Sequence, residues 1–506
     1  MKQLNTLILI ALMAIATTAV GQRYVTEVFT DVEVTTNVPY GFNASIINLL
    51  DNDTTNDAHP LAHPLLMDVY QPAGDTETDR PVVLYFHTGS FIPFPANGIT
   101  GGWKGDSVCV EICTRLAKMG YVAASVDYRL GWNPLDPQEL IRRWFLINAA
   151  YRGVQDARTC IRYFKKTAAE DGNPWGVDPN KIVLFGQGTG GYISLNTAAL
   201  DDYNKTLIPK FLLPGPVPMI IEQVNGNVNG TSYGFVPPGY PVFTPGDTLC
   251  YPNWPGYDSD FQLSVNLGGA LGDTSWIDPG QPPLISFHTP DDPFAPYVEG
   301  TVLVPVVNFP VVEVQGSYLA VKLANQYGNN DAFANADFTD PYTAAANVHN
   351  DGYQGLYPFL TGDPNDSSPW DIWAWNNPNA TENCDSVRAR MYIDTIMNYF
   401  APRACLVLGL GCDLSAYSAA EEVLDAGMVG LKVSPNPATA YVRFETNAEY
   451  PIQHIYVYDL NGRLVKVHTN VKSNDFTMQR YSLAKGTYVA KVIFEEGIVA
   501  QKILFH

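Results

Sequence analysis

The residues that come nearest to forming a reactive site lie in the segment Lys181-Ile-Val-Leu-Phe-Gly-Gln-Gly-Thr-Gly-Gly191. A short run of β-branched and aromatic residues leads into a glycine-rich turn, and the turn leads into a helix-like stretch from Tyr192 to Leu200. This is the order of a G-x-S-x-G turn, in which a sharp bend presents a nucleophilic serine. Aligned on its glycines, the serine position is Gly188, which has no side chain to attack with. The sequence therefore predicts the turn without its nucleophile.

The elements that would hold such a turn follow one another in residues 22–410. Strands are predicted at 81–86, 121–126, 181–185 and 283–287, and helices at 108–119, at 192–200, and from 136 towards 171 with an interruption near Gly153. Alternating strands and helices favour an α/β fold with a mostly parallel sheet. A helix at 386–400 and a strand at 404–410 are expected to close the domain.

Two long stretches interrupt this alternation, at about 201–280 and 298–350. Residues 207–259 are dense in Pro, Gly, Tyr and Asn, a composition that is poor in regular structure. Long irregular segments in compact domains are often lids or binding loops. Both stretches are therefore predicted to be lid-like insertions.

The N-terminus and the overall charge limit the functional classes. A basic residue at Lys2, an apolar run from Leu7 to Val20 and small residues at Ala19 and Gly21 predict a cleaved signal peptide over residues 1–21, whereas an anchor helix would need a longer apolar run. The net charge of −21 argues against nucleic acid as a partner. An exported protein that does not bind nucleic acid is expected.

The seven cysteines are compatible with export, which permits disulfides. Cys405 with Cys412, or either of them with Cys384, is the expected bridge, while Cys109 and Cys113 lie four apart on a predicted helix and are expected to pack in the core. None of the seven has the spacing of a zinc site, so neither a metal nor a cofactor is expected.

A second domain follows a linker at 411–429. Residues 430–506 alternate apolar and polar residues in short runs separated by turns, which predicts a small β-sandwich. Four of its segments, Val433-Ser-Pro-Asn-Pro437, Tyr458-Asp-Leu-Asn-Gly462, Gly486-Thr-Tyr488 and Lys502-Ile-Leu-Phe505, resemble the type A sorting domain of the type IX secretion system of Bacteroidetes. The resemblance implies that residues 430–506 bind the type IX secretion machinery and that the protein passes through the periplasm to be secreted or held on the outer-membrane surface. An ordinary adhesive or carbohydrate-binding sandwich is the alternative.

The large domain resembles secreted α/β-hydrolases of the carboxylesterase and feruloyl-esterase-like group. The matching segments are Met67-Asp-Val-Tyr-Gln-Pro72, His87-Thr-Gly-Ser-Phe91, Asp127-Tyr-Arg-Leu130, Val177-Asp-Pro-Asn-Lys-Ile182 and the loop from His288 to Tyr297. They occur in the order of that family and surround the turn at Gly188. The resemblance implies the α/β-hydrolase fold, with a mostly parallel sheet and helices on both faces.

In that group a serine attacks the acyl carbonyl, a histidine takes its proton and an aspartate orients the histidine. The resemblance implies Gly188 at the nucleophile position and Asp292 as the acid, with Asp291 the less favoured neighbour. His349 is the candidate base, since it is the only histidine between Asp292 and the closing helix; a solvated loop histidine is the alternative. His288 ends a predicted buried strand and is expected to be structural.

The oxyanion hole of this fold uses backbone N–H groups, which the resemblance implies at Thr88, Gly89 and Thr189. The loop departs from the HGGGF pattern at Thr88 and Ser90, and threonine cannot adopt the backbone angles that glycine can. The geometry of the hole is therefore expected to be altered.

These observations predict a secreted pseudoenzyme on an esterase-like scaffold, whose pocket binds a carbohydrate ester or another acylated small molecule. The alternative is an active carboxylic-ester hydrolase that uses a nucleophile other than serine, such as Thr189, or a water activated by histidine.

Overall fold

The computed structural model describes residues 23–47, 59–240, 243–304, 308–362, 366–372, 386–418, 424–459, 464–468, 471–481 and 483–506. The predicted signal peptide, Cys384 and the tip of the 458–462 turn lie outside these residues. The chain divides into a first unit, Met1–Asn335 with Tyr353–Asp413, and a second unit, Ala336–Gly352 with Leu414–His506. Among the helices in the described ranges, none combines the length and the apolar character needed to cross a membrane.

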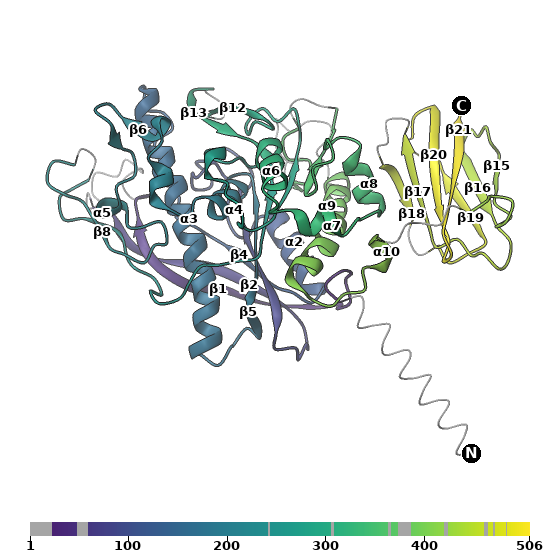
Figure 1. The fold of residues 1–506 in the computed structure, drawn as a ribbon, viewed down its shortest axis with the longest axis horizontal. Helices are drawn as coiled ribbons and strands as arrows, with labels where there is room; N and C mark the ends of the chain where they lie inside the picture. Colours follow the sequence, from purple (N-terminus) through teal and green to yellow (C-terminus); the bar gives the residue numbers. More distant parts are fainter. Residues whose placement is uncertain are drawn as a thin grey trace, which may run out of the picture. The chain divides into compact units, whose positions relative to one another are not determined.

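The first unit is built on an eight-stranded sheet with the order β1-β2-β4-β3-β5-β10-β11-β14 (Figure 1). Its first two strands are antiparallel to their neighbours, and all pairs from β4 to β14 are parallel. The strands are β1 (Val32–Ser45), β2 (Leu61–Pro72), β3 (Arg80–Phe86), β4 (Val122–Val126), β5 (Val177–Gln187), β10 (Leu263–Leu267), β11 (Leu284–His288) and β14 (Leu356–Pro358).

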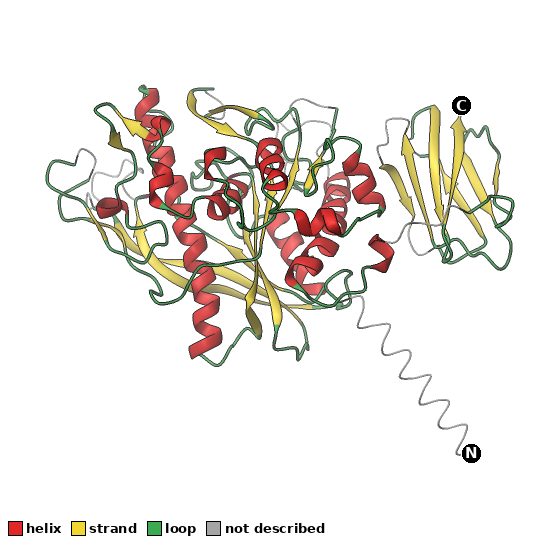
Figure 2. Ribbon diagram, in the orientation of Figure 1, coloured by secondary structure: helices red, strands yellow, loops and turns green. Residues whose placement is uncertain are grey.

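Helices cover both faces of this sheet (Figure 2). Successive residues of β5 point to opposite faces, so Phe185 contacts Phe400 of α9 while Leu184 belongs to the apolar cluster that includes residues of α3 and α4. The main helices are α2 (Ser107–Lys118), α3 (Glu139–Glu170), α4 (Thr189–Ala199), α6 (Ser317–Gln326) and α9 (Ser386–Leu408). This is the α/β-hydrolase fold that the sequence predicted.

Smaller elements fill the connections. They are β6 (Leu212–Leu213), β7 (Val217–Pro218), α5 (Glu222–Asn225), β8 (Gly234–Phe235), β9 (Thr248–Cys250), the hairpin β12 (Glu299–Leu303) and β13 (Pro310–Gln315), and α7 (Asp331–Asn335). Short 3-10 helices occur at Tyr203–Thr206, Pro209–Phe211 and Thr274–Trp276.

Two expectations about local structure, one for a helix and one for a strand, were wrong. No interruption occurs at Gly153, because α3 runs unbroken from Glu139 to Glu170. A Cβ at Gly153 would lie 2.9 Å from Ile193, so the glycine serves a close approach between α3 and α4. The predicted strand at 404–410 is instead the end of α9, where Ala401, Ala404 and Cys405 are buried at helical spacing.

The first predicted insertion contains a strand of the central sheet. β10 lies between β5 and β11, and all five of its residues are buried. The strand was not recognised in the sequence because it contains the polar residues Ser264 and Asn266. In the structure Ser264 forms a hydrogen bond with Ser194 (2.8 Å), and Asn266 donates one to Ser317 (2.8 Å). The second predicted insertion likewise contains α6, which packs against β11.

The cysteine predictions agree with the structure where it describes them. Cys405 and Cys412 form a disulfide, whereas Cys109 and Cys113 are free and buried on α2. Cys160 and Cys250 are also free and buried.

The second unit contains the predicted β-sandwich. One sheet has the order β15-β16-β19 and the other β18-β17-β20-β21. The strands are β15 (Lys432–Ser434), β16 (Tyr441–Glu445), β17 (His454–Asp459), β18 (Leu464–His468), β19 (Asp475–Gln479), β20 (Gly486–Ile493) and β21 (Ile498–Phe505).

The boundaries of this unit differ from the predicted ones. Leu424 and Val429, which were predicted to be linker, are buried in the sandwich core. The unit also includes α8 (Pro341–Asn347) and α10 (Ser415–Ser418), so residues 336–352 group with the sandwich and not with the domain predicted over 22–410.

Candidate functional site

The turn at Gly188 has the geometry that the sequence predicted. β5 ends at Gln187, α4 begins at Thr189, and Gly188 between them has φ 52° and ψ −116°. Residues with a side chain adopt such angles only at a cost of about 1–3 kcal/mol. The Gly188 N–H donates to the carbonyl of Leu267 at 2.8 Å, which ties the turn to the end of β10.

The flanking glycines of the motif are required by close packing. A Cβ at Gly186 would overlap the backbone carbonyl of Gly190, and a Cβ at Gly190 would overlap the carbonyl of Phe86. Because backbone cannot move aside as a side chain can, both positions accept only glycine. The glycines therefore fix a sharp strand–turn–helix.

The space next to Gly188 is occupied by Thr88. A Cβ built at Gly188 would overlap the hydroxyl oxygen of Thr88 and lie 3.1 Å from the Thr88 Cβ. A serine at this position would therefore meet the Thr88 side chain before its own hydroxyl was placed. The lack of a side chain at Gly188 and the threonine at position 88 are spatially complementary.

In the loop after β3, the residues with positive φ are not the threonine whose backbone angles were in question but the three residues that follow it. Thr88 has no positive φ, whereas Gly89 (124°), Ser90 (57°) and Phe91 (55°) do. The Ser90 carbonyl accepts the indole N–H of Trp132 at 2.7 Å, which fixes the loop to the segment that follows β4.

The three predicted oxyanion-hole donors lie at the same end of the sheet. Thr88 and Gly89 follow β3, Thr189 follows β5, and these strands pair in parallel with Phe86 opposite Gly186. Thr189 opens α4, where the N–H groups of the first turn have no acceptor within the helix. Their role in binding an oxyanion stays a prediction.

The Thr189 hydroxyl contacts a tyrosine. Its oxygen is 3.1 Å from the hydroxyl of Tyr128, which donates to the carbonyl of His87 at 2.9 Å. The Tyr128 ring stacks on His87 with the centroids 4.5 Å apart. Burial raises the pKa of Tyr128 far above its usual value, so it stays neutral and does not deprotonate Thr189.

Asp292 lies in the loop after β11, where its side chain is 3% exposed. Its carboxylate accepts the backbone N–H groups of Phe294 (2.7 Å) and Ala295 (3.0 Å), and its Oδ2 is 3.6 Å from Nε2 of His288. Burial raises the pKa of this carboxyl to about 7, against the lowering effect of the two N–H groups; the charge of Asp366 adds to the rise. Its neighbour Asp291 is exposed.

His288 has hydrogen bonds at both ring nitrogens. Nε2 donates to the Ala295 carbonyl at 3.0 Å, and Nδ1 lies 2.7 Å from the hydroxyl of Ser317, whose oxygen accepts from Asn266 at 2.8 Å. Burial lowers the pKa of His288 to about 4, although the bond to Ala295 raises it. A neutral imidazole with both nitrogens engaged is structural, as the sequence led us to expect.

His349, the predicted base, follows α8 and is half-buried, with its backbone N–H donating to Ala346 at 3.0 Å. It belongs to the second unit and Asp292 to the first. Its pairing with Asp292 stays a prediction, and the imidazole beside Asp292 in the first unit is that of His288.

Sequence reasoning did not find the roles of Tyr128, Asn266 and Ser317. Tyr128 lies within the segment that carried the family resemblance, but its partner Thr189 is 61 residues away. Asn266 lay in a predicted insertion and Ser317 in another, so neither was expected at the core of the sheet. Within the described ranges, no group of three or more His, Cys, Asp or Glu residues is placed to hold a metal ion.

Comparisons with known families match both units. Residues 67–210 match BD-FAE, an esterase and feruloyl-esterase-like family, and residues 432–506 match the secretion system C-terminal sorting domain. The chain is esterase-like, with a C-terminal sorting domain. The sorting domain belongs to the type IX secretion system and indicates export to the medium or the cell surface.

No curated protein is similar to the chain in sequence. The solved structures that match the chain include esterase 2 of Thermogutta terrifontis. The apo form of this esterase is 16% identical to this chain, with a TM-score of 0.32. The alignment covers 69% of this chain and 90% of the esterase. The same esterase phosphorylated by paraoxon is 21% identical to this chain, with a TM-score of 0.28. That alignment covers 53% of this chain and 73% of the esterase. These likenesses are weak, so the fold assignment rests on the strand order and the turn at Gly188.

Proposed function

We propose that this exported protein is a pseudoenzyme, which binds a ligand on an esterase-like scaffold without serine chemistry. The observation that supports this is the pair formed by Gly188 and Thr88, in which the place of a serine side chain is filled by a threonine hydroxyl. Without its nucleophile, a triad enzyme retains only the effects of the oxyanion hole and of binding, roughly 10³–10⁴-fold over water. The proposed ligand is a carbohydrate ester or another acylated small molecule.

The rest of the proposal concerns export and the remaining site residues. Residues 430–506 would bind the type IX secretion machinery of a Bacteroidetes-type cell, after a signal peptide at 1–21 directs the chain to the periplasm. Asp292 and His349 would be the acid and base left from an ancestral triad. Glycine at 188 also removes the backbone strain that a serine would bear there, so loss of the reaction stabilises the turn.

A fluorophosphonate probe and a short-chain ester assay on the full chain test this proposal. We expect neither labelling nor turnover from the unmodified protein, nor from Gly188→Ser, because Thr88 stays in the way. Gly188→Ser with Thr88→Gly has room for the serine and should be labelled if Asp292 and His349 are assembled. Gly188→Ala with Thr88→Gly is the matched control that lacks the hydroxyl. Strong labelling or turnover by the unmodified protein would refute the proposal.

A second candidate is a hydrolase with a nucleophile other than serine, because the Thr88 side chain does place a hydroxyl beside Gly188. Thr88→Val keeps the shape and removes this hydroxyl. If the unmodified protein turns over the ester and Thr88→Val does not, Thr88 is the nucleophile. Turnover that survives Thr88→Val but is lost in His349→Asn would indicate a water activated by His349.

A further inference from the structure

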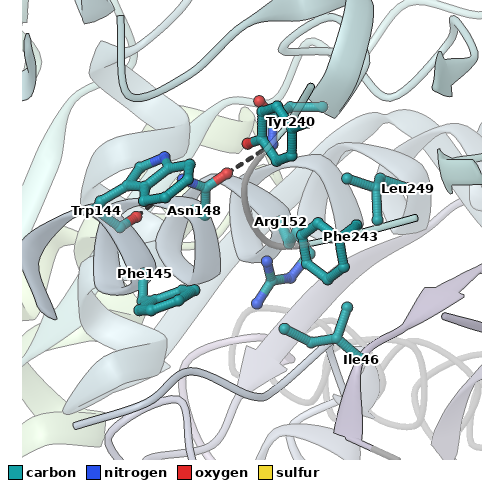
Figure 3. Close-up of a pocket in the computed structure, with 9 residues that line it drawn as sticks. Ile46, Trp144, Phe145, Asn148, Arg152, Tyr240, Phe243 and Leu249 are labelled. Atoms are coloured by element: carbon teal, nitrogen blue, oxygen red, sulfur yellow. Dashed lines mark hydrogen bonds between the residues drawn. The ribbon is translucent and has the colours of Figure 1, made fainter. Parts of the chain in front are cut away.

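The loop that runs from α5 to β9 covers a small cavity and carries aromatic side chains on its exposed side. The cavity measures about 30 Å³ and lies between this loop and α3, with Trp144, Tyr240 and Phe243 among its walls (Figure 3). A volume of this size holds about one or two water molecules, so it cannot hold an organic ligand. A ligand of this loop must therefore contact its outer surface.

Four aromatic rings lie in a row on the surface that this loop forms with the neighbouring strands β1 and β9. This aromatic row consists of Phe235, Tyr233, Tyr251 and Phe42. The ring centroids are 5.4 Å apart for Phe235 and Tyr233, 6.1 Å for Tyr233 and Tyr251, and 5.6 Å for Tyr251 and Phe42. Tyr233 (54%), Phe235 (49%) and Phe42 (45%) are exposed, and Tyr251 is half-buried. Segments that are far apart in the chain thus build one continuous aromatic surface.

Two buried asparagines fix the backbone of Phe42 and Tyr251. The Asn253 side chain accepts the N–H of Phe42 at 2.9 Å and donates to the Phe42 carbonyl at 3.0 Å. In the same way, Asn43 accepts the N–H of Tyr251 at 3.0 Å and donates to the Tyr251 carbonyl at 3.4 Å. A buried amide is costly unless it is hydrogen-bonded, so each asparagine holds its ring-bearing residue in one position.

The other two rings stand on a tightly packed segment. Tyr233 and Phe235 flank Gly234, and side chains two residues apart on a strand face the same way. A Cβ at Gly234 would overlap the backbone carbonyl of Val224 in α5, so the segment passes directly against that helix. The row is therefore presented on a backbone that is already in place, which lowers the entropic cost of binding a ligand.

The size and the charge of this surface favour a narrow, uncharged ligand. An aromatic side chain offers about 150–250 Å², so four rings that are about half exposed offer roughly 400 Å². A stable protein interface takes about 800 Å² from each partner, which is too much for the row to supply to a second copy of this chain. The net charge of −21 disfavours an anionic ligand.

We propose that the aromatic row binds a neutral polysaccharide chain, whose sugar rings stack on the exposed ring surfaces from Phe235 to Phe42. The C–H groups on the face of a sugar are apolar and slightly positive, so they stack on the negative face of an aromatic ring, while the hydroxyl groups at the edge stay in water. Successive sugars repeat this face as the row repeats its rings. Three strands separate β1, at the edge of the sheet, from β5 and the turn at Gly188. The proposal therefore goes beyond the ligand proposed for that turn and does not depend on it.

Affinity electrophoresis of the full chain tests the proposal, in native gels that contain hydroxyethylcellulose, arabinoxylan, galactomannan or dextran, with polygalacturonate as the acidic control. We expect at least one neutral polysaccharide to retard the protein and polygalacturonate not to. Tyr233→Ala with Phe235→Ala should weaken that binding roughly 10- to 100-fold, because two half-exposed rings are lost. Tyr327→Ala is the matched control, since Tyr327 is 43% exposed at the end of α6, outside the row. No retardation in any neutral gel, or equal retardation of the double variant, would overturn the proposal.

A second pair of variants tests whether the four rings act as one site. Phe42→Ala removes the ring at the other end of the row and should weaken binding of the same polysaccharide roughly 3- to 10-fold. Phe42→Tyr keeps the ring and should bind as the unmodified protein does. Thermal unfolding of both variants shows that any change in binding is not a loss of fold. Binding unchanged by Phe42→Ala, or weakened equally by Phe42→Tyr, would contradict a row of stacking rings.

Discussion

Replacing Gly188 with serine should destabilise the first unit through two separate effects. The backbone angles of Gly188 (φ 52°, ψ −116°) cost a residue with a side chain about 1–3 kcal/mol. The new Cβ also overlaps the Thr88 hydroxyl and comes within 3.1 Å of the Thr88 Cβ. Forcing an atom into a filled space costs about 1–3 kcal/mol more. The sum, about 2–6 kcal/mol, is a large part of the ~5–15 kcal/mol that holds a folded domain together.

Two further variants separate these effects. Thr88→Gly removes both overlapping atoms, so its combination with Gly188→Ser should show a favourable coupling energy of about 1–3 kcal/mol. Gly74 also has a positive φ, 71°, but no atom lies within 4 Å of the place where its Cβ would be. Gly74→Ser therefore reports a backbone penalty without overlap.

Urea unfolding followed by tryptophan fluorescence gives these energies. All nine tryptophans lie in the sequence of the first unit, so the signal reports that unit alone. If Gly188→Ser costs no more than Gly74→Ser and shows no coupling to Thr88→Gly, then Thr88 does not fill the space beside Gly188.

Three other predictions follow from the described contacts. Because burial raises the pKa of Asp292 to about 7, the folded state holds a proton that the unfolded state releases, and stability falls as the pH rises from about 4 to about 7. Asp292→Asn removes this pH-dependent loss of stability. In thermal unfolding, the stability of the variant minus that of the unmodified protein should therefore be larger at about pH 8 than at about pH 5. The same stability difference at both pH values would contradict the raised pKa of Asp292. Reducing the Cys405–Cys412 disulfide, whose cysteines are 7 residues apart, should cost about 2–3 kcal/mol in urea unfolding, and an unchanged midpoint would count against this. Gly153→Ala should destabilise by about 1–3 kcal/mol despite alanine's higher helix propensity; Ile193→Val should recover part of the loss, and a stabilised Gly153→Ala would show that α3 and α4 are not in close contact.

Local patterns were enough to predict many of the elements. The apolar run 81–86 and the segment around 181–185 are strands β3 and β5, because short β-branched and aromatic runs between turns favour buried strands. The alternation of apolar and polar residues over 430–506 likewise predicted the small sandwich, to which strands β16 and β20 belong. These predictions succeeded because the signal and the structure involve the same few neighbouring residues.

The sequence predictions failed where the local structure depends on contacts with residues that are distant in the chain. β10 was not recognised because Ser264 and Asn266 look like loop residues until Ser194 and Ser317 satisfy them. Gly153 was read as a break in a helix, but its lack of a side chain accommodates Ile193, 40 residues later in the sequence.

The sequence by itself determined that a sharp turn occurs at Gly188, because the shape of a tight turn depends on a few adjacent glycines. Only the tertiary structure decided that Thr88 fills the space beside Gly188 and that Asp292 lies against His288. Volume and charge in a packed interior are set by segments that are far apart in the chain, and folding alone brings those segments into contact.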